Sequence, residues 1–140
     1  MNPETNKCVI VVDENLPVGI IANSAAILGM TLGKCRPELV GTDVLDKDGQ
    51  QHTGIIEIPL PVLKTNTNHM KELRAKLYST EYSDLLAVDF SDIAQSCKAY
   101  EDYIHKMADA VQNDLFYWGI AIYGEKKKVN KLTGSLPLLR

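Results

Sequence analysis

Residues 8–33 read CVIVVDENLPVGIIANSAAILGMTLG and predict a strand followed by a helix. This stretch opens with Cys8–Val12, a β-branched run with no polar alternation, which is typical of a central strand covered on both faces. Pro17 then suits the first turn of a helix. No charged residue occurs in 18–33, so we expect the helix there to be covered on nearly every side. A buried strand followed by a buried helix indicates an α/β domain.

The middle of the chain predicts a hairpin, a short strand and a second helix. Residues 38–45 and 51–58 are strand-like and flank an Asp-Gly turn at residues 48–49, which favours a β-hairpin. Residues 62–64 predict a short strand. The four residues after this strand all offer side chains that can cap a helix N-terminus, so a helix is expected to follow.

The second half of the chain alternates strands with helices. Residues 85–88 predict a strand that ends at Asp89. Apolar residues then recur at spacings of three and four, which predicts one long amphipathic helix over residues 92–113. Two further strands and a short basic helix are expected at residues 118–123, 136–139 and 126–132, respectively.

This order of elements predicts the fold class. Strands that alternate with helices, with a hairpin inserted, form a mixed β-sheet with helices on both faces, so we expect a three-layer α/β/α fold. At 140 residues the chain is long enough for one core and too short for two ordinary domains. A single α/β domain over residues 1–140 is therefore the expectation.

Composition argues against several classes of function. The 15 basic and 18 acidic residues give a net charge of −3, whereas proteins that hold nucleic acid through its phosphates carry a basic excess, so nucleic acid is not an expected partner. The three cysteines lack a C-x-x-C spacing and the three histidines are far apart, so neither a disulfide framework nor a metal site is expected. Reduced thiols favour a cytoplasmic protein.

Membrane and cofactor signals are also weak. The apolar stretch 17–33 contains Asn23, Ser24, Thr31 and three glycines, which favours a buried helix over a membrane span. No G-x-G-x-x-G motif is present, so no nucleotide cofactor is expected. The sequence thus predicts a protein without a membrane segment and without a bound cofactor.

Two segments resemble peptidyl-tRNA hydrolase II. KCVIVVDENLPVGIIANSAAILG at residues 7–29 is similar to the strand, acidic loop and Ala-rich helix that open that fold. GIAIYGEKKKVNKLTGSLPLL at residues 119–139 is similar to its closing strand, short helix and Thr-Gly turn. The whole chain, with its NLPVGIIAN, PVLKTNT and DFSDIA segments, resembles more closely the domain-of-unknown-function 2000 family. The resemblance implies a peptidyl-tRNA hydrolase II-like fold.

The catalytic residues of the hydrolase family carry over poorly. Ala22 stands where that family has a lysine at the start of its first helix, and Ala26 stands where it has a glutamine. Asp89 matches the family's acidic residue at the end of a central strand, while its threonine has no clear counterpart here. The resemblance therefore implies a relative that lacks much of the hydrolase's catalytic equipment.

Three polar clusters are expected at the carboxyl edge of the sheet, where open α/β sheets bind ligands. The candidate ligand-binding residues are Asp13, Asn15, Asn23, Ser24, Lys64, Thr65 and Ser91. If the strands run parallel, Asp13, Lys64 and Asp89 converge on one cleft that fixes a small polar ligand. These residue types also form ordinary turns and caps, so both interpretations stay open. Asp89 is also the candidate catalytic base, although an aspartate that ends a strand more often caps backbone N–H groups.

Three functions follow from these observations. The leading hypothesis is a non-hydrolase member of this fold that binds a small polar ligand or a protein partner in the cleft. The first alternative is a hydrolase of peptidyl-tRNA or a related acyl ester, with Asp89 as base and Lys64 replacing the missing lysine. The second is a structural assembly subunit. Because the two long helices offer more apolar surface than a small sheet covers, a homodimer is expected, and the hydrolase resemblance implies the same.

Overall fold

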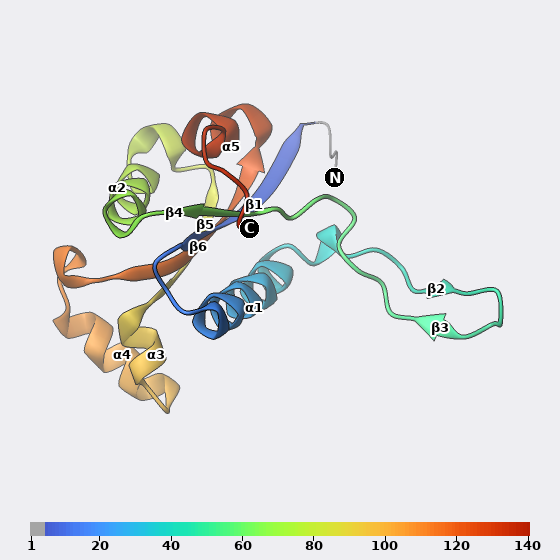
Figure 1. Cartoon of the computed structure of the whole chain (residues 1–140), viewed down its shortest axis with the longest axis horizontal. Helices are drawn as coiled ribbons and strands as arrows, with labels where there is room; N and C mark the ends of the chain where they lie inside the picture. Colours follow the sequence, from blue (N-terminus) through green and yellow to red (C-terminus); the bar gives the residue numbers. More distant parts are fainter. Residues whose placement is uncertain (1–4) are drawn as a thin grey trace.

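A four-stranded mixed sheet forms the centre of the computed structural model, which describes residues 5–140 (Figure 1). The strands lie in the order β4–β1–β6–β5, with bounds Val62–Thr65, Asn6–Asp13, Tyr117–Glu125 and Leu86–Ser91. β4 is parallel to β1, and β6 is antiparallel to both β1 and β5. Hence β1, β4 and β5 run in one direction, and their carboxyl ends lie at the same edge of the sheet.

Helices cover both faces of this sheet. Helix α1 (Val18–Cys35) packs on one face, and α2 (Thr67–Leu77) and α5 (Lys126–Thr133) pack on the other (Figure 1). The α2 N-terminus is capped by Asn66, whose side chain accepts the His69 N–H at 2.8 Å. The expected three-layer α/β/α fold with a mixed sheet is confirmed.

Strand β1 contributes side chains to the hydrophobic clusters on both faces of the sheet. Val9 and Val11 join the cluster with α2 and α5, whereas Ile10 and Val12 join the cluster with α1, and all four are buried. Cys8 is fully buried as well, and burial raises the pKa of its thiol to about 12. A central strand covered on both faces, as residues 8–12 predict, is therefore confirmed.

Helix α1 is less covered than its sequence suggests. Its buried residues are Ile21, Ser24, Leu28 and Leu32, which face the sheet. Val18 and Met30 are 82% and 83% exposed, so the expectation of cover on nearly every side is wrong. Among the described residues, the sheet, the 3₁₀ turn Pro37–Leu39 and α3 contact α1, and none of these elements covers its outer side. By length and composition α1 could also cross a membrane, and in this structure one of its sides packs on β1, β5 and β6.

The hairpin is present but shorter than expected. Its strands are β2 (Val44–Leu45) and β3 (Gln51–His52), and they extend away from the main body (Figure 1). Gly49 provides the positive φ of 81° that its turn needs. Within the expected ranges 38–45 and 51–58, pairing resumes only at the base of the arm, where Val40 and Ile56 form an isolated antiparallel bridge. All side chains from 42 to 53 are exposed, so no described segment packs against the arm to make its strands longer.

The long helix expected over residues 92–113 is wrong. The chain forms α3 (Asp92–Ser96) and α4 (Tyr100–Asp109) with a break between them. The Ile93 carbonyl accepts the Ser96 hydroxyl at 2.8 Å and the Cys97 thiol at 3.2 Å, while the Cys97 N–H turns to Ala94 instead. Side chains thus take the acceptor that the next α-helical bond needs, and the helix ends there.

The last strand expected, at residues 136–139, is also absent. This segment makes one bridge between Leu63 and Leu138, flanked by hydrogen bonds from Lys64 N–H to Pro137 and from Leu139 N–H to Val62. Because Pro137 has no N–H to donate, a regular ladder cannot form. The segment nevertheless covers the outer edge of β4.

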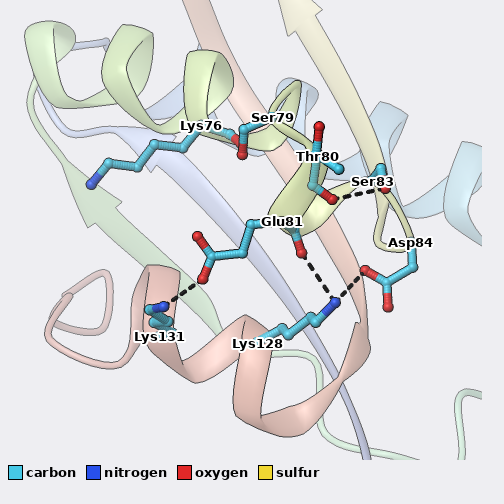
Figure 2. A network of polar contacts seen from close by, with 8 residues as sticks. All are labelled: Lys76, Ser79, Thr80, Glu81, Ser83, Asp84, Lys128 and Lys131. Carbon is cyan, nitrogen blue, oxygen red and sulfur yellow. Dashed lines mark hydrogen bonds and ion pairs between the residues drawn. The ribbon is translucent and has the colours of Figure 1, made fainter.

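A polar network ties α5 to the 3₁₀ turn Thr80–Tyr82 (Figure 2). Lys128 donates to the Asp84 carboxylate at 2.8 Å and to the Glu81 carbonyl at 3.0 Å, and Lys131 pairs with the Glu81 carboxylate. These lysines lower the pKa of both carboxyls. The network therefore stabilises the fold above the unfolded-state pKa values and is lost as pH falls through the lower folded-state values. Since the pairs are exposed, the effect is small.

The close approach of α1 to β6 gives a first prediction. An added Cβ at Gly119 would lie 2.6 Å from the buried Leu28 Cδ1, so we expect Gly119→Ala to reduce the free energy of unfolding by about 1–3 kcal/mol. The matched control is Gly29→Ala within α1, where no atom lies within 4 Å of an added Cβ. This change should stabilise the protein by about 0.5–1 kcal/mol. Urea unfolding measures both, and a harmless Gly119→Ala would contradict the packing.

Candidate functional site

Asp13 and Thr65 lie side by side where β1 and β4 end. They are register partners, and they are 4% and 8% exposed. Asp13 Oδ1 accepts the Asn15 N–H at 3.0 Å, and its Oδ2 accepts the Thr67 hydroxyl at 2.7 Å. Asp13 thus holds the loop after β1 against the first turn of α2.

Lys64 lies on the opposite face of the sheet. It is the register partner of Val12, which packs toward α1, whereas Asp13 and Thr65 face α2. Asp89 pairs with Ile120, which also faces α2. Hence Asp13 and Asp89 share a face, and the structure does not bring Lys64 to them.

The sequence predicted that Asp89 ends a strand over residues 85–88, but Asp89 lies inside β5, which continues to Ser91. Its Oδ2 accepts Arg74 Nε at 2.8 Å, and both side chains are mostly buried. The Arg74 guanidinium also stacks 3.9 Å from the Tyr78 ring centroid. Burial, and then the negative charge of Asp89, raises the pKa of Tyr117 to about 12. Asp89 therefore belongs to a largely dry ion pair between β5 and α2.

The remaining predicted residues lie apart from this pair. Ser24 is buried in α1 and donates to the Ile20 carbonyl at 2.8 Å. Asn23 donates to Gln95 at 3.3 Å, which links α1 to α3. Ser91 is fully buried, and its hydroxyl is the one buried side-chain polar atom without a hydrogen bond in residues 5–140.

Two hollows lie near these residues. The first is a polar hollow of about 480 Å³ at the N-terminus of α2. It is lined by Asn15, Asn66, Thr67, Asn68, His69 and Glu72. Of the predicted ligand-binding residues, only Asn15 lines it, and Asp13 beside it already accepts a hydrogen bond on each oxygen.

The second hollow, which we call the edge pocket, has a volume of about 400 Å³. It is lined by Ile27 and Thr31 of α1, Val88, Asp89 and Phe90 of β5, and Ala94, Cys97, Lys98, Ala99, Tyr100 and Tyr103 of α3–α4. The lining includes three residues of β5 but none of β6, and β6 is the strand that pairs with the inner side of β5, so the pocket lies toward the outer side of β5. The edge pocket therefore lies beside β5, between α1 and α3–α4.

The edge pocket combines apolar walls with few polar groups. Like any tyrosine hydroxyl, that of Tyr103 is protonated and able to donate at neutral pH, and burial, then the charge of Asp89, raises its pKa further. Lys98 is exposed and makes no ion pair in the described part of the chain. Among residues 5–140, no group of three or more metal-ligating side chains is close enough to hold a metal ion.

Sequence reasoning found only Asp89 among the residues that line the edge pocket. Ile27 and Thr31 are four apart within the uncharged stretch 18–33, and Tyr100 and Tyr103 are three apart. Each pair lies on one helix face, which was a usable signal. What the sequence could not show is that the two faces oppose each other across the edge of β5.

Comparisons with known proteins place the fold but no activity. A family model described as "Protein of unknown function (DUF2000)" matches residues 6–140. A solved structure of the protein of unknown function Atu0240, from Agrobacterium tumefaciens strain C58, has a TM-score of 0.86 at 15% identity. The match covers 97% of this chain and 98% of that one. A search of curated proteins gives no match.

The Arg74–Asp89 pair gives a second prediction. Arg74→Met leaves a mostly buried carboxylate without its partner, so we expect the free energy of unfolding to fall by roughly 2–4 kcal/mol. The double variant Arg74→Met/Asp89→Leu should recover most of this loss, because no charge is then left alone.

The control for this prediction is Lys106→Met, which breaks the exposed Lys106–Asp102 pair at 3.6 Å. It should change stability by less than about 0.5 kcal/mol. Urea unfolding of the four proteins measures these effects. Equal losses for Arg74→Met and Lys106→Met would contradict the burial of the first pair.

Proposed function

Because this chain belongs to the DUF2000 family, whose description assigns no reaction, we propose from the site itself that it is a binding protein whose ligand occupies the edge pocket. The observation that carries the proposal is the composition of that pocket. Its volume of about 400 Å³ lies in the usual range for ligand sites, and apolar and aromatic side chains surround a few polar groups. The ligand that fits has an apolar body with polar groups at fixed positions.

The state of Asp89 supports binding over hydrolysis. A general base must face its substrate, whereas the Asp89 carboxylate is directed toward α2, where its Oδ2 accepts a hydrogen bond from Arg74. Ala22 and Ala26, where the hydrolase resemblance would require a lysine and a glutamine, are exposed on α1. The hydrolase resemblance itself stays a prediction, since the matching structure is of a protein of unknown function.

The polar hollow is the weaker place for a ligand. It is nearly all polar, and its neighbour Asp13 has both carboxylate oxygens engaged by Asn15 and Thr67. A small polar ligand held there would correspond to the cleft expected from the sequence. Binding in the polar hollow is the alternative outcome of the fragment screen with Asn15→Leu.

The proposal is tested with Trp118, the single tryptophan of the chain. Trp118 packs edge-on against Phe90 with ring centroids 6.1 Å apart, and Phe90 lines the edge pocket. A fragment library is screened for changes in Trp118 fluorescence, and the hits are confirmed by ligand-observed NMR. We expect Thr31→Phe, which fills the pocket, to weaken the hits about tenfold or more.

The matched control is Thr53→Phe on the exposed hairpin, which should leave the affinity unchanged. Hits that survive Thr31→Phe but are lost in Asn15→Leu would move the ligand to the polar hollow. A screen without hits, or hits equally strong in Thr31→Phe and Thr53→Phe, would contradict the proposal.

We further propose a homodimer formed through the outer side of α1, in a cytoplasmic setting. Val18, Ala22, Ala26 and Met30 are four residues apart and all exposed, so they form an uncharged stripe. Two such stripes can pack without burying a charge. This arrangement also supports the assembly reading of the sequence.

Light scattering tests the dimer. We expect a mass of twice the 15.5 kDa of one chain, and a return to the monomer mass in Met30→Lys. The control Val44→Lys places the same charge on the exposed hairpin and should leave the dimer intact. A wild-type protein with the mass of one chain would contradict the dimer.

A further inference from the structure

The two edges of the sheet are treated differently by the chain. At β4, the C-terminal segment covers the outer edge, because the Lys64 N–H donates to Pro137 and the Leu139 N–H donates to Val62. At β5, no segment of the described chain pairs with the outer side. β5 is therefore an edge strand whose outer backbone groups are left for another partner.

The register shows which groups these are. The N–H of Ile10 donates to Pro61, and the N–H of Glu14 donates to Thr65. The backbone N–H and C=O groups of even-numbered β1 residues are therefore directed toward β4, and those of odd-numbered residues toward β6. Val9 and Val11 oppose Ile122 and Ile120, so the backbone groups of even-numbered β6 residues bond to β1. The backbone groups of odd-numbered β6 residues are therefore directed toward β5.

The same alternation continues into β5. Val88 and Phe90 oppose Ala121 and Gly119 and bond to β6. Leu86 opposes Tyr123 in the same way, so the backbone N–H and C=O groups of the residues that alternate with these, Ala87 and Asp89, point away from β6. No hydrogen bond to these four groups is present in residues 5–140.

The edge pocket lies at this outer side. Asp89 lines it, with Ile27 and Thr31 on the α1 side and Tyr103 on the α4 side. An added strand would project alternate side chains toward these two walls. The helices also flank the edge, so one extended chain can enter while a second sheet edge is kept away.

From this arrangement we infer that the edge pocket takes an extended peptide segment, which pairs with β5 as a fifth strand. The inference rests on the proposed function, because it names the ligand class of the same pocket. The backbone of the peptide pairs with Ala87 and Asp89, as in strand addition to a sheet edge. One bulky apolar side chain packs against Ile27, Val88 and Phe90.

The charges of the pocket narrow the peptide further. Asp89 is neutralised by Arg74, so the exposed Lys98 is the uncompensated charge of the lining. A carboxylate on the peptide complements Lys98. The preferred segment therefore carries an acidic group beside its bulky apolar residue.

A library of short peptides, screened by Trp118 fluorescence, tests this inference. The best binder is then resynthesised with one backbone N-methyl group at a time. Because only alternate residues of an added strand face β5, we expect losses of about tenfold at every second residue and small changes between them. Losses without this alternation would overturn the pairing.

Protein variants test the same contact from the other side. Ala87→Pro removes an outward N–H and leaves the ladder to β6 intact, so it should weaken the peptide about tenfold while fragment hits in the pocket bind as before. Lys98→Gln should weaken acidic peptides and leave their neutral amide analogues unchanged. Should Ala87→Pro fail to fold, the N-methyl series on the wild-type chain decides alone.

The outcomes separate this inference from the proposed function. Fragments that bind in a Thr31→Phe-sensitive way, with no peptide bound, would overturn the peptide and leave the pocket as the ligand site. If neither fragments nor peptides bind, both proposals fail. Peptides that bind equally to wild type and Ala87→Pro would overturn pairing with β5.

Discussion

Strand β1 is buried on both faces, and its burial dictates which elements must surround it. A strand without a polar side requires cover above and below, and the chain provides α1 on one face and α2 with α5 on the other. It also requires paired neighbours, which are β4 and β6. With β1 enclosed in this way, the sheet ends at β4 and β5, and only the edges remain to be satisfied.

How much of this was predictable follows from the kind of signal each element carries. Apolar runs such as residues 8–12 and 118–123 identify strands because a short continuous run of apolar residues predicts a buried strand. The break between α3 and α4 has no such signal, since it depends on the Ser96 and Cys97 side chains taking one carbonyl. The exposed outer side of α1 could not be read either, because the sequence does not say how many layers cover a helix.

The sequence predicts the candidate site only in part. The sequence identifies the residues at the carboxyl ends of the strands, but the face on which each one lies depends on register, and a shift of one residue reverses it. Lys64 therefore lies on the α1 face while its neighbour Thr65 lies with Asp13. The opposed faces of α1 and α4 across the edge of β5 involve residues far apart in the chain, which local patterns cannot connect.

The sequence predicted Asp89 for the chemistry of its side chain, whereas in the structure it is the backbone of Asp89 that lines the edge pocket. Its side chain is directed to α2 and held by Arg74, while its backbone points outward into the edge pocket. The ion pair fixes β5 from the inner side and so holds the outer backbone groups in one place. The opposite wall is built differently, since no residue of α3 or α4 is fully buried and the Asn23–Gln95 bond links α3 to α1. Segments with few buried residues open at low free-energy cost, so we expect the α3–α4 wall of the edge pocket to adjust to a ligand more readily than its β5 floor.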